Sequence, residues 1–137
     1  MQPEEHRRSP FIELIGGVVE EFREGYVRLS VRLEERHMNP NGVMHGGVLT
    51  TLMDEAAGGV IASVRGLEAM AEAPHATVDM SVSFLAGTRV GDEIIVEATA
   101  LKVGRSVAWA EAEATRRGKD GLVAKGRFTF TILRRDG

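Results

Sequence analysis

The sequence predicts an α+β domain in which one long helix lies against a mainly antiparallel sheet of about six strands. Apolar residues follow the spacing of an amphipathic helix in only one stretch, residues 49–61. Segments in which apolar and polar residues alternate, as in half-buried strands, lie before and after it. The length of 137 residues suits a single core, so we predict one domain over residues 1–137.

The composition excludes several functional classes. The formal net charge of −3 offers no basic excess for binding nucleic acid. The chain has no cysteine, which excludes disulfides, thiolate metal sites and a cysteine nucleophile. Residues 1–10 lack the apolar centre of a signal peptide, and no apolar run approaches the roughly 20 residues of a membrane span. We therefore expect a soluble cytoplasmic protein.

The first third of the chain predicts a lead-in, an apolar turn and a hairpin. Residues 1–10 form the lead-in, and residues 11–15 form a short apolar turn that docks on the body. A strand is expected from residue 16 or 17 to about residue 22. A second strand is expected over residues 26–33, where apolar and polar residues alternate strictly.

A polar loop over residues 34–44, with the turn signal Asn41-Gly42, separates the hairpin from the helix. The apolar stripe of the helix consists of Leu49, Leu52, Met53, Ala56, Ala57, Val60 and Ile61. Gly58 and Gly59 interrupt it, each at a cost of roughly 1 kcal/mol relative to Ala. Because the stripe continues past them, we expect the helix to continue and a neighbour to pack there too closely for a Cβ atom.

The second half predicts a loop over residues 65–75 and then four strands. In the first, over residues 76–84, alternation places Thr77, Asp79, Ser81 and Ser83 on the face opposite Ala76, Val78, Met80, Val82 and Phe84. Strands over residues 93–103, 106–115 and 122–133 follow, and residues 134–137 form a tail. Alanines at alternate positions 108–114 leave room on one face for a bulky partner, and the helix is the candidate.

Candidate chemistry concentrates where the loop becomes the helix. The first N–H groups of a helix have no partner within it, and the helix dipole adds partial positive charge there. Gly46 N–H is therefore a candidate oxyanion donor for acyl transfer, because glycine lets a carbonyl approach the backbone. A tight junction without chemistry is the alternative interpretation of the His45-Gly46-Gly47 run.

Asp54 lies about two helical turns later, at the border of the apolar stripe. The residues in phase with it are Gly47, Thr50 and Gly58, which are small and uncharged. Its carboxylate could therefore face a cleft or another chain and act as general base or nucleophile. A solvated helix acid is the alternative, and we expect Glu55 to point to solvent.

The remaining polar residues give weaker signals. His6, His37 and His75 are expected at the surface, and no three ligands show the spacing of a zinc site, so we expect no metal. The turn Gly104-Arg105-Ser106 could hold an anionic group through one guanidinium and backbone N–H groups. It could equally be an exposed hairpin turn.

Asn39, the His45-Gly46-Gly47 run and Asp54, at this spacing, closely resemble the signature of hotdog-fold acyl-CoA thioesterases of the PaaI-like group, small enzymes linked to phenylacetate breakdown. The strand over residues 76–85 and the turn at residues 104–106 are similar to the family's later strands. The resemblance covers residues 18–133. It implies a hotdog fold, an active site at a dimer interface, dimers that usually pair into tetramers, and acyl-CoA as substrate with no separate cofactor.

The resemblance also implies residue roles. Asp54 would be the general base or nucleophile, and Gly46 N–H would polarise the thioester carbonyl. Asn39 would orient the carbonyl or the attacking water, His45 would support this group, and Thr77 would position water. Gly104, Arg105 and Ser106 would contact the CoA nucleotide.

Gly46 and Asp54 are separated by roughly 12 Å on one helix, at a rise of 1.5 Å per residue. One site must therefore join Gly46 of one chain to Asp54 of another. We expect hydrolysis of an aryl- or medium-chain acyl-CoA to the free acid and CoA. The alternatives are a non-catalytic acyl-CoA sensor, which would usually carry a DNA-binding module that residues 1–10 cannot hold, and a hotdog dehydratase or hydratase. Residues 63–75 match no family pattern, which leaves the acyl group open.

Overall fold

The structure, a computed structural model, describes residues 9–134. Three α-helices and a 3-10 turn accompany six strands. The helices are α1 (Pro10–Leu14), α2 (Gly46–Arg65) and α3 (Leu67–Glu72), and the turn is η2 (Glu35–His37). The strands are β1 (Val18–Arg23), β2 (Tyr26–Arg32), β3 (His75–Phe84), β4 (Glu93–Val103), β5 (Val107–Arg116) and β6 (Leu122–Ile132).

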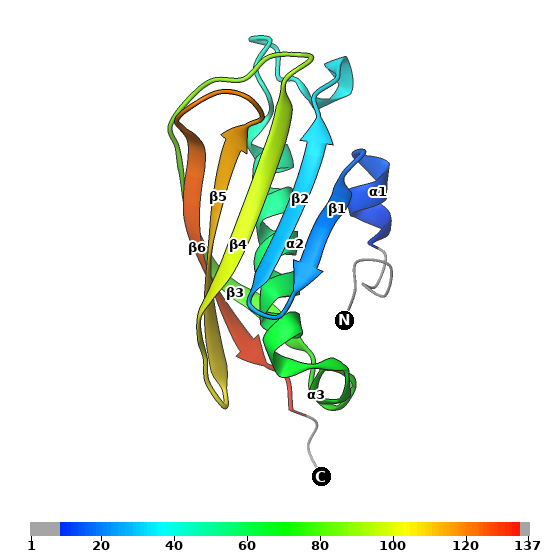
Figure 1. The fold of residues 1–137 in the computed structure, drawn as a ribbon, viewed down its shortest axis with the longest axis vertical. Coiled ribbons are helices and arrows are strands. Elements are labelled where there is room, and N and C mark those ends of the chain that lie inside the picture. Colours follow the sequence, from blue (N-terminus) through cyan, green and yellow to red (C-terminus); the bar gives the residue numbers. More distant parts are fainter. Residues whose placement is uncertain (1–8, 135–137) are drawn as a thin grey trace.

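The strands form one sheet in the order β1-β2-β4-β5-β6-β3, and every neighbouring pair is antiparallel. The long helix α2 runs along one face of this sheet (Figure 1). The predicted fold class, a six-stranded antiparallel sheet around one long helix, is therefore confirmed. The extent of the single domain stays a prediction, and residues 1–8 of the lead-in, with His6, and residues 135–137 of the tail lie outside the described residues.

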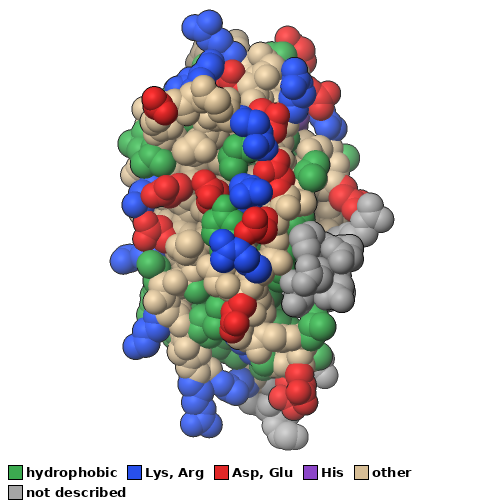
Figure 2. Space-filling view, viewed as in Figure 1, with side chains coloured by type: hydrophobic (Ala, Val, Ile, Leu, Met, Phe, Trp, Pro, Cys, Tyr) green, Lys and Arg blue, Asp and Glu red, His purple; other side chains and the backbone are tan. Residues whose placement is uncertain are grey.

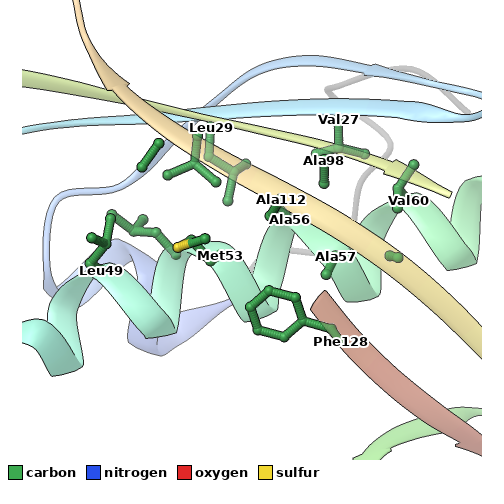
Figure 3. Packing of buried hydrophobic residues seen from close by; sticks show 14 of the residues in the cluster. Val27, Leu29, Leu49, Met53, Ala56, Ala57, Val60, Ala98, Ala112 and Phe128 are labelled. Atoms are coloured by element: carbon green, nitrogen blue, oxygen red, sulfur yellow. The ribbon is translucent and has the colours of Figure 1, made fainter. Parts of the chain in front are cut away.

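The core lies between α2 and the inner face of the sheet. Figure 3 shows Met53, Ala56 and Val60 of α2 directed toward the side chains of the sheet. The predicted apolar stripe of α2 is buried throughout. The alternating alanines of β5 are also fully buried, and their small side chains let α2 approach the sheet, as the pattern predicted. By length and composition α2 could cross a membrane, but eight of its residues are buried in this core.

The outer face of the sheet carries charged side chains. Figure 2 shows acidic and basic groups interspersed over it. Arg28 pairs with Glu20 at 2.9 Å, and Arg117 pairs with Glu20 and Glu93. Partly exposed pairs of this kind contribute roughly 0–1 kcal/mol each. The predicted site residues of α2 lie on the opposite side of the sheet (Figure 1).

Two predictions about α2 and its C-terminal end are wrong. Residues 65–75 are not all loop, because α3 follows after Gly66, whose φ of +87° and ψ of 162° suit glycine alone and end α2. The helix does continue through Gly58 and Gly59. However, a Cβ atom at Gly58 would lie 3.7 Å from Phe130 and 3.8 Å from His75, which is ordinary contact. Close packing does not explain that glycine.

The predicted faces of β3 are confirmed for residues 79–84 and are wrong for the residues before them. Thr77 pairs with Phe130 and Asp79 pairs with Thr129, so Val78 has no partner on β6 and forms a β-bulge. The extra residue reverses the alternation, and Thr77 shares the helix-facing side with Met80 and Phe84. β3 is moreover an edge strand, and Val78 remains 60% exposed.

Candidate active site

The start of α2 is fixed by His45. Its Nδ1 atom accepts a hydrogen bond of 3.0 Å from Gly47 N–H, and its own backbone N–H donates to the carbonyl of His37 at 2.8 Å. Nδ1 is therefore unprotonated, and the neutral ring carries its proton on Nε2. His45 thus acts as the N-cap of the helix, which agrees with a supporting role.

Gly46 is the first residue of α2, and within residues 9–134 its N–H meets no acceptor. A Cβ atom at this position would lie 3.3 Å from Cζ of Phe84, a contact tighter than side chains usually make. The Phe84 ring therefore lies against Gly46. The residue offers a backbone donor at the positive end of the helix dipole, as oxyanion stabilisation requires.

Asn39 shapes the loop that precedes the helix. Its Oδ1 atom accepts hydrogen bonds from the N–H groups of Asn41 at 2.8 Å and Val43 at 3.3 Å. Its backbone N–H donates to the carbonyl of Val43 at 2.8 Å. Because two N–H donors hold the side-chain oxygen, the Nδ2 amide is the end of Asn39 that can donate to a ligand.

Asp54 and Thr77 meet across the gap between α2 and β3. The hydroxyl of Thr77 donates a hydrogen bond of 2.7 Å to Oδ1 of Asp54. The bulge at Val78 makes this contact possible, because it places Thr77 on the helix side of β3. Within residues 9–134 this is the only hydrogen bond to the half-buried carboxylate, so one oxygen is anchored and the other is available to a substrate or water.

Asp54 opens into a cavity of about 320 Å³ between α1, α2 and β3. Its lining consists of Ser9, Phe11, Ile12, Thr50, Thr51, Asp54, Glu55 and Met80. Glu55, which we expected to point to solvent, is half-buried and lines this open cavity. Gly46 and Phe84 line a different cavity of about 200 Å³ at the start of the helix. Gly46 and Asp54 of one chain therefore do not share a site.

His75 packs against α2 close to Asp54. Because Arg65 only donates, Nδ1 of His75 accepts from it at 3.2 Å, and Nε2–H donates to the carbonyl of Gly58 at 2.9 Å. Burial lowers the pKa of His75, the hydrogen bond to Gly58 partly offsets this, the charge of Arg65 lowers the pKa further, and that of Asp54 raises it. The ring is neutral and structural, and it is half-buried at the start of β3 instead of lying in the predicted surface loop.

His37 is also misplaced by the prediction, since only 1% of it is exposed. It accepts from the N–H of Glu34 at 2.9 Å and donates to the carbonyl of Ile15 at 2.6 Å. The first contact is local and caps the turn η2. The second ties the loop before α2 to the segment after α1, and no local sequence pattern signals it.

The sequence model of the Thioesterase superfamily matches residues 41–123, which include Gly46, Asp54 and Thr77. This chain belongs to the thioesterase superfamily. The thioesterase is 33% identical to acyl-coenzyme A thioesterase 13 of Mus musculus over 100 residues, which cover 72% of this chain and 67% of the relative. The resemblance found in the sequence is thereby confirmed, and the protein is a thioester hydrolase.

Solved structures agree with this assignment. A conserved protein of Pseudomonas aeruginosa is 30% identical to the thioesterase, with a TM-score of 0.83 over 92% of this chain and 95% of that one. A mutant of the phenylacetic acid degradation protein PaaI of Thermus thermophilus has a TM-score of 0.80 at 24% identity, over 91% of this chain and 100% of that one. The latter similarity is one of fold, and the fold is the hotdog fold.

The predicted site residues of the thioesterase thus lie in three separate places. Asp54 and Thr77 are in direct contact in the middle of α2, whereas Asn39, His45 and Gly46 gather at its start. The third set, Gly104, Arg105 and Ser106, forms the turn between β4 and β5. A Cβ atom at Gly104 would lie 2.7 Å from the carbonyl oxygen of Val107, so only glycine fits the turn. No hydrogen bond of the described chain joins this turn to either group.

Residues 9–134 contain no cluster of three His, Asp or Glu side chains able to hold a metal ion.

Proposed function

We propose that this thioesterase hydrolyses an aryl- or medium-chain acyl-CoA to the free acid and CoA, in the cytoplasm, with Asp54 as general base or nucleophile. The observation that carries the proposal is the hydrogen bond of 2.7 Å from Thr77 to Asp54 at the mouth of a cavity. It holds a carboxylate in one orientation while leaving its second oxygen available. Fold neighbours support the ligand class, since a hypothetical thioesterase of Streptococcus pneumoniae has been solved with coenzyme A.

Two chemical routes fit this arrangement. In the first, Asp54 takes a proton from a water held by Thr77, the hydroxide bonds to the thioester carbon, and the C–S bond breaks to release the CoA thiolate. In the second, a carboxylate oxygen of Asp54 bonds to the carbon itself, the C–S bond breaks to release the CoA thiolate, and water hydrolyses the resulting anhydride to the free acid and the Asp54 carboxylate. In both routes negative charge develops on the carbonyl oxygen, where Gly46 N–H and the Nδ2 amide of Asn39 can donate.

The oxyanion donor comes from a second subunit in this proposal. Gly46 and Asp54 lie roughly 12 Å apart along α2 at a rise of 1.5 Å per residue, and they line different cavities. The free edge of β3 exposes apolar side chains that a partner would cover, namely Val78, Met80, Phe84 and Leu85. Pairing of two β3 edges around a twofold axis creates two equivalent sites.

Contacts within one chain specify the register of that pair. Of the residues of β3, Thr77 contacts Asp54 of α2, and Phe84 contacts Gly46 at the start of α2. For Gly46 of the partner subunit to reach Asp54, its Phe84 must lie opposite Thr77. Because Val78 is bulged out of regular pairing, the ladder between these positions consists of Thr77 and residues 79–84, and the twofold axis of an antiparallel pair then passes through its midpoint, Ser81. Such dimers would pair further into tetramers, and Gly104, Arg105 and Ser106 would contact the CoA nucleotide.

Release of free thiol from a panel of acyl-CoAs, measured with a chromogenic reagent, tests the activity. Asp54→Ala should lower kcat by at least a hundredfold while the circular dichroism spectrum is retained. Glu68→Ala, an exposed acid on α3, is the matched control and should retain activity. Near-full activity of Asp54→Ala would show that the mechanism is wrong.

Mixing two inactive variants tests the shared site. A Gly46→Val chain keeps Asp54, and an Asp54→Ala chain keeps Gly46. A mixed dimer therefore contains one intact site and one doubly defective site. Random exchange of equal amounts should restore about a quarter of the wild-type activity, because half of the dimers are mixed and each has one working site. A site built within one chain would give no recovery.

A further inference from the structure

The cavity beside Asp54 has walls of two kinds. Phe11 and Ile12 of α1 and Met80 of β3 are apolar, whereas Asp54 and Glu55 are acidic. The remaining lining residues are Ser9, Thr50 and Thr51. The described lining thus contains two carboxylates and no basic side chain.

The apolar wall is held in place by the anchoring of α1. Ile12 is buried in the core, and its carbonyl accepts a hydrogen bond of 2.8 Å from Gly17 N–H. Arg36 donates to the carbonyl of Leu14 at 2.6 Å, which fixes the end of the helix. Phe11 is therefore presented by an anchored helix, yet it remains 55% exposed at the cavity. An exposed aromatic ring fixed beside a reactive carboxylate suits contact with an apolar ligand.

The polar part of the wall offers few donors. The hydroxyls of Thr50 and Thr51 both donate to the carbonyl of Gly47, at 3.2 and 2.7 Å. Glu55 is half-buried, and within residues 9–134 it makes no hydrogen bond or ion pair. A ligand group with negative charge would meet an uncompensated carboxylate here and would find no cation among the described lining residues. Such like-charge contacts are repulsive and strengthen as water is excluded.

We propose that Phe11 and Glu55 determine acyl specificity: Phe11 packs against a neutral apolar acyl group, and Glu55 rejects acyl groups that end in a carboxylate. This inference rests on the proposed function, because it places the acyl group in the cavity next to Asp54. A cavity of about 320 Å³ has room for an acyl group of several carbons or an aromatic ring.

The test of Glu55 compares hexanoyl-CoA with adipoyl-CoA, which differ at the chain end by a carboxylate. The wild-type protein should prefer hexanoyl-CoA in kcat/KM by at least tenfold. Glu55→Gln should reduce that ratio at least fivefold, and Glu55→Asp should largely preserve it. A ratio that is the same in the wild-type and Glu55→Gln proteins overturns the role of Glu55.

The test of Phe11 compares octanoyl-CoA with acetyl-CoA. Phe11→Ala should reduce the octanoyl preference at least fivefold, and Phe11→Leu should reduce it less. Leu14→Ala removes an exposed apolar side chain of the same helix that lies outside the cavity, and it should leave the ratio unchanged. Equal effects of Phe11→Ala and Leu14→Ala would overturn the role of Phe11.

Dissociation constants separate this inference from the proposed hydrolysis. Non-hydrolysable thioether analogues of the same four CoA compounds, measured by calorimetry, should show the same preferences and the same changes in the variants. If the protein cleaves no thioester but the binding ratios shift as stated, the proposed activity fails and the acyl pocket stands. If thioesters are cleaved but neither kinetic nor binding ratios shift, the pocket assignment is wrong.

Discussion

Replacing Thr77 by valine tests the contact on which the proposed mechanism depends. Valine has nearly the shape of threonine and an equally high strand propensity, so the change removes little except the hydroxyl. The backbone pairing of residue 77 with Phe130 does not involve the side chain and should persist. The substitution therefore deletes the 2.7 Å hydrogen bond to Asp54 and leaves that carboxylate without its anchor.

The size of the effect follows from the charge and exposure of Asp54. A hydrogen bond to a charged group contributes roughly 1.5–3 kcal/mol. Asp54 is only half-buried, so water replaces part of the lost interaction, and about 1–2 kcal/mol is a reasonable expectation. Since 1.36 kcal/mol corresponds to a factor of ten in rate, kcat should fall about 5- to 30-fold.

Thiol release under saturating acyl-CoA measures this change. Thr77→Ser keeps the hydroxyl and should retain activity within about threefold of the wild type. Thr99→Val makes the same chemical change at an exposed position of β4 and should leave kcat unaltered. If Thr77→Val retains kcat within twofold while thermal unfolding is unchanged, the hydrogen bond does not orient a catalytic carboxylate.

Three further changes test other parts of the structure. Gly46→Ala places a Cβ atom 3.3 Å from Phe84 and beside the proposed oxyanion donor, so kcat/KM for thiol release should fall about tenfold or more; unchanged kinetics would exclude Gly46 as that donor. Gly58→Ala adds a Cβ atom in ordinary contact, so urea unfolding should show a gain of up to about 1 kcal/mol from helix propensity, and a loss would mean that a partner packs there. Because burial lowers the pKa of His75 below its unfolded value, His75 contributes full stability above about pH 6.5 and loses it as the pH falls toward the folded pKa. The urea midpoint of the wild-type protein should therefore fall more between pH 7.5 and pH 5.5 than that of His75→Asn. An equal fall in both proteins would refute the lowered pKa of His75.

The helix and most of the strands could be predicted because their signals are local. The apolar stripe of α2 and the alternation in β2 and β5 each lie within one segment, and the structure buries the expected faces. The Gly104 turn is likewise found where the sequence indicates it. The spacing of apolar residues identifies such elements because it shows which face of a helix or strand packs against the core.

The errors concern contacts between distant segments. The alternation in β3 indicates an apolar face, but not that the strand lies at the edge of the sheet with that face partly exposed. His37 is buried because it reaches the carbonyl of Ile15, and His75 is half-buried because α2 supplies Gly58 and Arg65. The cavity that Glu55 lines depends on α1, which closes one side of it. None of these distant partners is visible in the residues next to the histidines or the glutamate.

The bulge at Val78 means that the pairing of β3, rather than residue type alone, controls the chemistry of this site. One residue outside regular pairing turns Thr77 toward Asp54 while Met80 and Phe84 keep their positions on the same side. If Val78 paired regularly with Phe130, Thr77 would lie opposite Thr131 and its hydroxyl would turn outward, although the sequence of the strand would be unchanged. Among proteins of this fold, the gain or loss of a bulge at this point of β3 therefore offers a short evolutionary route between chains that hold a hydroxyl on the helix acid and chains that lack it.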